Sequence, residues 1–256
     1  MQSLASSFEG ELVQYYDLFF LQNNVSGEVQ YVKGLVDRYV SDKTNLLDVG
    51  CGTGIYAQNF ADYFNKILGI DISDDMIAFA REKHTKDNVE YAVQDIRSLK
   101  LEHKYGVATA LSHVIGYQLE NIDVENMLIN VNRALQDNGI FIFNFYNAPQ
   151  LFNGSLKPIT KIAENEEARI VRLSNASLDT LENELLLDYY YIIERDEENP
   201  ITIEIHEKMR YFTLKEITYY LKKTGFRVLD FFDWGGENQN LTSWNVGIVA
   251  EKTDEY

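Results

Sequence analysis

Three glycines at alternating positions follow a short apolar run that contains an acidic residue. The glycines are Gly50, Gly52 and Gly54, and the acidic residue is Asp48, within residues 46–49. Glycine adopts positive φ without strain and leaves space where a Cβ would collide with a bound molecule. A strand that runs into such a turn predicts a loop whose backbone closely approaches a nucleotide-like ligand.

A second carboxylate stands at a matching place on the next apolar run, residues 66–70. Asp71 follows this run directly and lies 21 residues after Gly50. At the tip of the strand beside a glycine turn, a carboxylate can accept hydrogen bonds from both hydroxyls of a ribose. The alternative is a capping residue for the helix that is predicted to follow. The adjacent glycine turn favours the ribose role.

These residues need a sheet that brings the ends of successive strands to one edge. Apolar runs that read as strands alternate with amphipathic helical patterns, and residues 6–40 also read as helical. The strand candidates are residues 45–49, 66–70, 89–92, 106–111 and 139–145, and the helical patterns are residues 56–64, 75–83 and 123–135. This βαβα order predicts an α/β fold with a doubly wound, parallel sheet.

The alternation stops after residue 146. Three runs rich in Ile, Leu and Tyr then predict antiparallel strands, at residues 169–174, 184–194 and 201–210. A helix at residues 213–223 and strands at 226–231 and 246–251 close the chain, and Thr213 and Glu216 have the spacing of a capping box. We expect a ligand-binding domain of residues 1–146 and 211–256 with an N-terminal helical cap. Residues 147–210 form an inserted subdomain that contacts substrate, closes as a lid or pairs two subunits.

The ordered motifs resemble those of the class I S-adenosylmethionine-dependent methyltransferases. The first motif of that family reads D-x-G-x-G-x-G, which Asp48 and the glycine turn match, whereas a dinucleotide site would need G-x-G-x-x-G. The resemblance implies a Rossmann-like doubly wound seven-stranded sheet, mostly parallel with the last strand antiparallel, and an antiparallel β insertion after the fifth strand. The layout is similar to that of the amino-sugar N-methyltransferases.

The same resemblance implies a donor site for S-adenosyl-L-methionine, released as S-adenosyl-L-homocysteine. Asp71 would bind the ribose, Asp95 and Ile96 would frame the adenine, and Asp48 would order the loop and help to hold the methionine amino group. A bracing role for Asp48 in the loop is an equal alternative. The expected donor-binding residues are Tyr16, Asp48, Gly50, Gly52, Gly54, Asp71, Ile72, Met76, Asp95, Ile96, Leu111 and Ser112.

Residues for the acceptor are expected near the end of the fourth strand, where the methyl group should point. His113 follows that strand, and an imidazole can act as a general base near neutral pH; its alternative role is packing at a strand end. Tyr16 belongs to a tyrosine pair that closes over the donor in similar enzymes, or else lies on the face of an amphipathic helix. The substrate-binding candidates are His113, Tyr117, Asn144, Tyr146 and His206.

Composition limits the classes of partner. The 256 residues include 23 Lys and Arg against 40 Asp and Glu, a formal charge of −17, which disfavours binding to nucleic acid. No apolar run is long enough to span a bilayer, and a single cysteine, Cys51, excludes an internal disulfide. No cluster of His, Cys and carboxylate side chains has metal-ligand spacing, so no metal is expected. We expect a cytoplasmic protein without a membrane partner, with a homodimer through the insertion as an option.

The sequence therefore predicts a transferase that moves a methyl group to an N or O atom of a small polar metabolite, such as a sugar. Two alternatives stay open. One is a methyltransferase that acts on a protein or a lipid-linked acceptor. The other is a catalytically silent relative that binds the donor, although the glycine turn and Asp71 are both intact.

Overall fold

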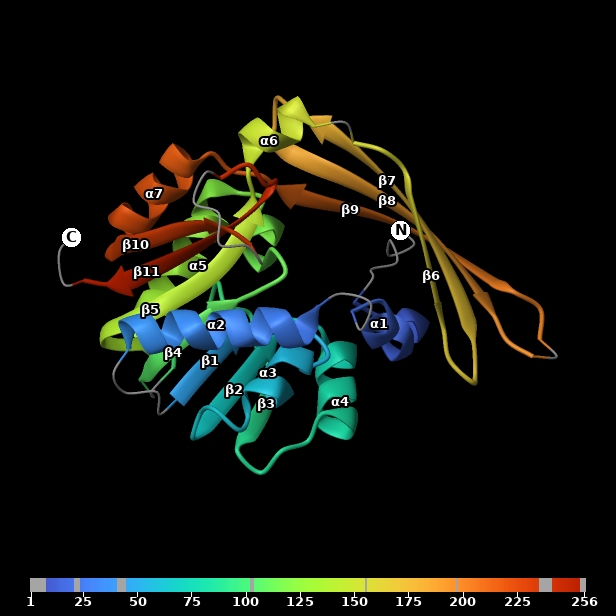
Figure 1. The fold of residues 1–256 in the computed structure, drawn as a ribbon, viewed down its shortest axis with the longest axis horizontal. Coiled ribbons are helices and arrows are strands. Elements are labelled where there is room, and N and C mark those ends of the chain that lie inside the picture. Colours follow the sequence, from blue (N-terminus) through green and yellow to red (C-terminus); the bar gives the residue numbers. More distant parts are fainter. Residues whose placement is uncertain are drawn as a thin grey trace.

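A computed structural model describes residues 8–20, 24–40, 45–101, 104–154, 156–196, 198–234 and 241–253. Its larger sheet has seven strands in the order β3-β2-β1-β4-β5-β11-β10 (Figure 1). Strand β1 pairs in parallel with β2 and β4, whereas β11 runs antiparallel to both β5 and β10. The predicted mixed sheet with an antiparallel last strand is confirmed. The strands are β1 (Asn45–Val49), β2 (Lys66–Asp71), β3 (Val89–Val93), β4 (Tyr105–Ala110), β5 (Leu135–Tyr146), β10 (Phe226–Asp233) and β11 (Asn245–Lys252).

Helices cover both faces of this sheet, and each face has its own hydrophobic cluster. One cluster joins the sheet to α2 (Val25–Tyr39), α3 (Ile55–Phe60) and α4 (Asp74–Lys83), and the other joins it to α5 (Asn121–Ala134) and α7 (Leu214–Lys223). Every residue of β4 is buried, as expected of a central parallel strand between two helical layers. Truncation of a fully buried side chain such as Phe141 would cost about 3–5 kcal/mol.

Local capping signals set where two of these helices begin. Ser73 caps α4 by accepting a hydrogen bond from the Met76 N–H at 3.1 Å, and Thr213 caps α7 by accepting one from Glu216 at 3.2 Å. The carboxylate of Glu216 accepts a hydrogen bond from Arg210 at 2.6 Å. Of the predicted capping box, the hydrogen bond to the Thr213 side chain therefore forms. The Glu216 side chain instead connects α7 to the end of β9.

The second sheet is the insertion that follows β5. It contains four antiparallel strands in the order β6-β7-β8-β9 and extends as a wing beyond the first sheet (Figure 1). Three of its strands were predicted, but the edge strand β6 and the short helix α6 were not, because β6 mixes charged and apolar residues and α6 has only six residues. The elements are α6 (Ala148–Asn153), β6 (Ile159–Glu164), β7 (Arg169–Asp179), β8 (Glu184–Glu194) and β9 (Ile201–Arg210).

The N-terminal segment connects the two sheets. A short 3-10 turn, η1 (Gly10–Leu12), leads into α1 (Val13–Phe20), whose buried side chains pack against the inner face of the second sheet. Arg195, beyond the end of β8, donates a hydrogen bond from Nε to the hydroxyl of Tyr15 at 2.9 Å. Figure 1 shows α1 between the wing and α4. Within the described ranges, no helix has the length and apolar character needed to cross a bilayer.

Candidate functional site

A cavity of about 260 Å³ lies at the carboxyl ends of β1, β2 and β4. This is the edge at which the strand order reverses on either side of β1, the usual ligand position in an open α/β sheet. The structure brings most of the predicted donor-binding residues to its wall: Tyr16, Asp48, Gly50, Gly52, Asp71, Ile72, Asp95, Ile96, Leu111 and Ser112. Two others lie outside the wall: Gly54 is the N-cap residue of α3, and Met76 is fully buried in the core.

The three glycines of the turn all have positive φ, but they are needed for different reasons. A Cβ on Gly50 would lie 2.5 Å from Val114, and a Cβ on Gly54 would lie 2.5 Å from the hydroxyl oxygen of Tyr91. A Cβ on Gly52 would meet nothing within 4 Å. Gly50 and Gly54 therefore allow close packing within the protein, and the space beside Gly52 is left for a ligand.

Asp71 joins the tip of β2 to the glycine turn. One carboxylate oxygen accepts a hydrogen bond from the Gly52 N–H at 2.9 Å, and the other accepts one from the Ser73 N–H at 2.9 Å. Burial raises the pKa of this carboxyl, and the two backbone hydrogen bonds oppose that shift. Ser73, not Asp71, caps α4. Asp71 is therefore positioned by the loop at the wall of the cavity.

Asp48 presents a buried carboxylate oxygen with no protein partner. Its Oδ1 accepts a hydrogen bond from the Thr109 hydroxyl at 2.8 Å, whereas Oδ2 has no hydrogen-bond partner among the described residues. The side chain is only 2% exposed, and burial raises its pKa to about 7. A buried oxygen in this state is stabilised by a donor group from a ligand. The wall therefore fits a molecule that carries an amino group.

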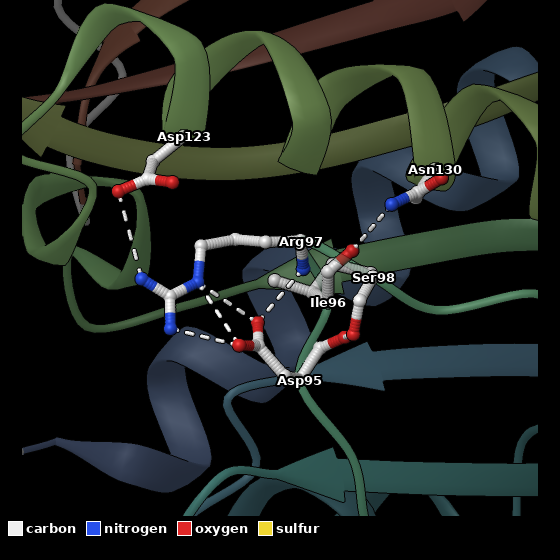
Figure 2. Close-up of polar contacts among 6 residues, drawn as sticks. All are labelled: Asp95, Ile96, Arg97, Ser98, Asp123 and Asn130. Atoms are coloured by element: carbon white, nitrogen blue, oxygen red, sulfur yellow. Dashed lines mark hydrogen bonds and ion pairs between the residues drawn. The ribbon is translucent and has the colours of Figure 1, made fainter.

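Asp95 is held rigidly at the end of β3. Figure 2 shows the Arg97 guanidinium donating hydrogen bonds to both carboxylate oxygens, from Nη2 to Oδ2 at 2.7 Å and from Nε to Oδ1 at 3.0 Å. This hydrogen bonding lowers the pKa of Asp95, so the carboxylate stays ionised. Arg97 also lies 3.5 Å from Asp123, and Asn130 donates to the Ile96 carbonyl at 2.8 Å. Helix α5 therefore fixes the segment that was predicted to frame an adenine.

Apolar and aromatic side chains complete the wall. Ile72 is 63% exposed although it is a large aliphatic residue, and it faces the cavity together with Ile96. Phe8 lines the opening, with its ring centroid 6.1 Å from that of Tyr16 and 5.4 Å from that of Tyr117. The cavity thus combines fixed carboxylates with flat apolar surfaces, which suits a nucleoside that carries a charged amino acid group.

Comparison with known proteins agrees with this arrangement. Residues 46–139 match the family described as "Methyltransferase domain". Over 249 residues the chain is 22% identical to a dTDP-3-amino-3,6-dideoxy-alpha-D-glucopyranose N,N-dimethyltransferase of Streptomyces fradiae, covering 96% of this chain and 95% of that one. The matched residues include the glycine turn, Asp71 and Asp95.

Solved structures share the fold of this chain over nearly its whole length. The sugar N-methyltransferase KedS8 from Streptoalloteichus sp ATCC 53650 superposes with a TM-score of 0.81, at 19% identity and 99% coverage of both chains. The S-adenosylmethionine-bound structure of CalS10, an amino pentose methyltransferase from Micromonospora echinaspora, gives a TM-score of 0.78 at 17% identity, covering 96% of this chain and 99% of that one. The inserted sheet therefore belongs to the shared fold.

His113 is packed among aromatic rings. Its φ is 64°, its ring stacks on Tyr146 with centroids 4.0 Å apart, and the Trp244 ring lies 5.7 Å away. Asn144 Nδ2 lies 3.5 Å from His113 Nε2. Burial lowers the pKa of His113 to about 3, so the imidazole is neutral and a weak proton acceptor at neutral pH. These contacts fit the packing alternative better than the general base.

The other candidates for the acceptor separate into two groups. Tyr117, in the 3-10 turn η2 (Val114–Tyr117), lines the cavity, while Asn144 and Tyr146 lie behind it around His113. His206 is 51% exposed and lies 2.6 Å from Asp188 on the outer face of the second sheet. The structure does not bring His206 to the cavity.

Several residues of the site were not identified from the sequence, and four of them bear on the acceptor side or the opening. Phe8 and Gln118 line the cavity, Trp244 stacks on Tyr146, and Glu207 contacts Tyr117. Only Glu207 had a recognisable signal, because it occupies an apolar-face position in an alternating strand. The others depend on contacts between distant parts of the chain.

Proposed function

We propose that this chain transfers the methyl group of S-adenosylmethionine to the amine nitrogen of a small, sugar-like acceptor. The observation that carries the proposal is the Asp48 oxygen that has no hydrogen-bond partner among the described residues, beside a glycine turn in a cavity at the edge of the sheet. The Streptomyces fradiae relative is named for the N,N-dimethylation of an amino sugar, and this relative matches almost the full chain. The acidic surface also fits a small acceptor better than a nucleic acid.

The donor would be held by fixed groups along the cavity wall. Asp71 would accept the ribose hydroxyls, Asp48 the donor amino group, and Asp95 the adenine amine, with Ile72 and Ile96 against the ring. S-adenosylmethionine supplies a methyl group on a sulfonium, which is already activated for transfer. The chain must therefore bind, orient and exclude water, and it needs no strong general base.

The acceptor would bind between the donor cavity and the inner face of the second sheet. Tyr117, Tyr146 and Tyr189 all pack against one hydrophobic cluster that joins α6 to β8 and β9. Flat rings with hydroxyl groups at their edges suit a sugar, which has apolar faces and a polar rim. The inserted segment, residues 147–210, is therefore assigned to acceptor recognition.

Calorimetry with S-adenosylmethionine tests the donor half of the proposal. The wild type should bind, and Asp71→Ala should weaken binding by about tenfold or more, the scale of a lost charge-assisted hydrogen bond. Asp87→Ala, which changes an exposed carboxylate, is the matched control. Absence of binding by the wild type would refute the proposed function.

A labelled donor tests the acceptor half. Methyl transfer should occur to amino sugars, including the dTDP-linked 3-amino-3,6-dideoxy sugar named for the relative. If the label is found only in the proteins or lipids of an extract, the acceptor is a protein or a lipid-linked molecule and this proposal is wrong. Donor binding without transfer to any acceptor would indicate a catalytically silent relative.

A further inference from the structure

Strand β9 places a carboxylate in an otherwise apolar row. Ile203, Ile205 and Met209 lie on the face that packs against α1 and α6, and the alternation of the strand puts Glu207 on that same face. Glu204 and His206 point to the opposite face, where they are exposed. A half-buried carboxylate among apolar neighbours is unfavourable unless polar or charged groups meet it. Its position therefore calls for a functional explanation.

Glu207 is separated from the donor cavity by one side chain. Its Oε2 accepts a hydrogen bond from the Tyr117 hydroxyl at 3.4 Å, and Tyr117 itself lines the cavity. Tyr117 also meets Phe8 edge to face at a centroid distance of 5.4 Å. A molecule that reaches from the donor cavity toward the second sheet would therefore pass along Tyr117 and meet Glu207.

Aromatic rings surround this carboxylate. Burial, followed by the negative charge of Glu207, raises the pKa of Tyr16, Tyr117 and Tyr146, so these hydroxyls remain protonated and can donate hydrogen bonds. Tyr189 is a further neighbour, and its pKa is raised by burial and by the charges of Tyr146 and Glu207. Ring faces carry partial negative charge, which adds to that of the carboxylate and attracts cations.

A fixed cation also acts on this cluster, from β7. The Arg172 guanidinium lies 5.1 Å from the centroid of Phe19 and 5.3 Å from that of Tyr189. Its charge opposes that of Glu207 at Tyr146 and Tyr189, but it is not among the groups that shift the pKa of Tyr16 or Tyr117. Toward the donor cavity, the carboxylates that act on this cluster are therefore Glu207, at Tyr16 and Tyr117, and Asp71, at Tyr16.

We propose that Glu207 is the acceptor-binding residue that selects an amine over a hydroxyl, by pairing its carboxylate with the positive charge of the acceptor nitrogen beside Tyr117. This inference rests on the proposed methyl transfer and identifies the group that gives it nitrogen selectivity. An amine is cationic in its resting protonated form and again after methylation, whereas a hydroxyl is neutral. A carboxylate therefore favours the amine in both states.

The charge also develops during the transfer itself. The bound ammonium first releases one proton to water, and the free amine then attacks the methyl carbon. The N–C bond forms as the C–S bond breaks with its electron pair on sulfur. The nitrogen becomes an ammonium cation, which Glu207 stabilises, and its extra proton then leaves to water. Glu207 remains ionised throughout and acts as a fixed opposite charge, not as the base.

Binding of a matched pair of sugars tests this selectivity. Calorimetry on the protein saturated with S-adenosylhomocysteine would compare the dTDP-linked 3-amino-3,6-dideoxy sugar with dTDP-6-deoxyglucose, which differs only by a hydroxyl in place of the amine. The wild type should prefer the amino sugar by about tenfold or more. Glu207→Gln, which keeps shape and hydrogen bonding, should lose that preference, and Glu207→Asp should retain part of it. Glu204→Gln, on the outer face of the same strand, should behave as the wild type.

Turnover and donor affinity separate this role from a structural one. In Glu207→Gln the kcat/KM for the amine should fall by about tenfold or more, while the Kd for S-adenosylmethionine and the thermal midpoint stay within error of the wild type. Unchanged selectivity in Glu207→Gln, or equal binding of both sugars by the wild type, would overturn the role of Glu207 alone. If the wild type binds neither sugar and methylates no amine, both the role of Glu207 and the proposed function are wrong.

Discussion

Asp17 and Thr53 are joined by a hydrogen bond of 2.5 Å between the N-terminal helix and the glycine turn. The second carboxylate oxygen of Asp17 lies 2.8 Å from Nε2 of His84, at the end of α4. Both His84 and Asp17 are largely shielded from solvent, with side-chain exposures of 9% and 16%. Because Tyr16 precedes Asp17 and lines the cavity, these contacts hold one wall of the cavity in place.

Replacing Asp17 by alanine should therefore weaken donor binding even though Asp17 is outside the cavity wall. We expect the Kd for S-adenosylmethionine to rise by about five- to tenfold, the effect of one lost charged hydrogen bond that positions the loop. Calorimetry measures the change. Gln14→Ala alters an exposed position of the same helix and should have no effect. Equal affinity in both variants would contradict a role for the Asp17–Thr53 contact.

The ionisation of Asp48 should make stability depend on pH. Its pKa moves from 3.8 to about 7 on folding, so between these values the folded protein binds a proton that the unfolded chain does not. The free energy of unfolding should therefore fall as pH rises through this range, with a slope of up to about 1.4 kcal/mol per pH unit. Asp48→Asn should remove this contribution. Urea denaturation at a series of pH values, without donor, measures both slopes, and identical slopes would refute the expectation.

His113 should not govern the pH profile of the reaction. With a pKa of about 3 the imidazole is neutral across the range in which methyltransferases are usually assayed. His113→Gln should lower kcat by less than about tenfold and leave the shape of the kcat profile unchanged. Loss of an ionisation between pH 6 and 8 in this variant would instead support the general base.

The burial of His113 changes the pH dependence of stability in the opposite direction from the burial of Asp48. The unfolded chain protonates His113 below its usual pKa of 6.5, whereas the folded protein does not until about 3. The free energy of unfolding should thus decrease as pH falls through this interval, and His113→Gln should reduce that decrease. Denaturation curves of the two single variants separate this contribution from that of Asp48.

The glycines of the turn should respond differently to alanine. Gly54→Ala places a methyl group 2.5 Å from the Tyr91 hydroxyl and should lower stability by more than the roughly 1 kcal/mol expected from positive φ alone. Gly52→Ala meets open space and should lose about 1 kcal/mol of stability, but its methyl group would occupy the donor side of the loop. Donor affinity should therefore fall more in the folded Gly52→Ala protein. Thermal unfolding and calorimetry on both variants test the difference.

The sequence by itself determined the order of the elements and most of the residues that line the cavity beside the glycine turn. The glycine turn, Asp71, and the strands at residues 45–49, 184–194 and 201–210 are local patterns, whose spacing dictates backbone geometry whatever surrounds them. Strand β6 and helix α6 were not predicted, because short segments of mixed polarity take their structure from their neighbours.

Only the tertiary structure decided which side chains face one another. His206 and Glu207 are adjacent in sequence, yet the alternation and packing of β9 send one to solvent and the other toward Tyr117. Likewise the contact from Asp17 to Thr53, and the aromatic burial that leaves His113 neutral, join segments far apart in the chain. The charge state and orientation of a side chain depend on such distant neighbours, and no local spacing encodes them.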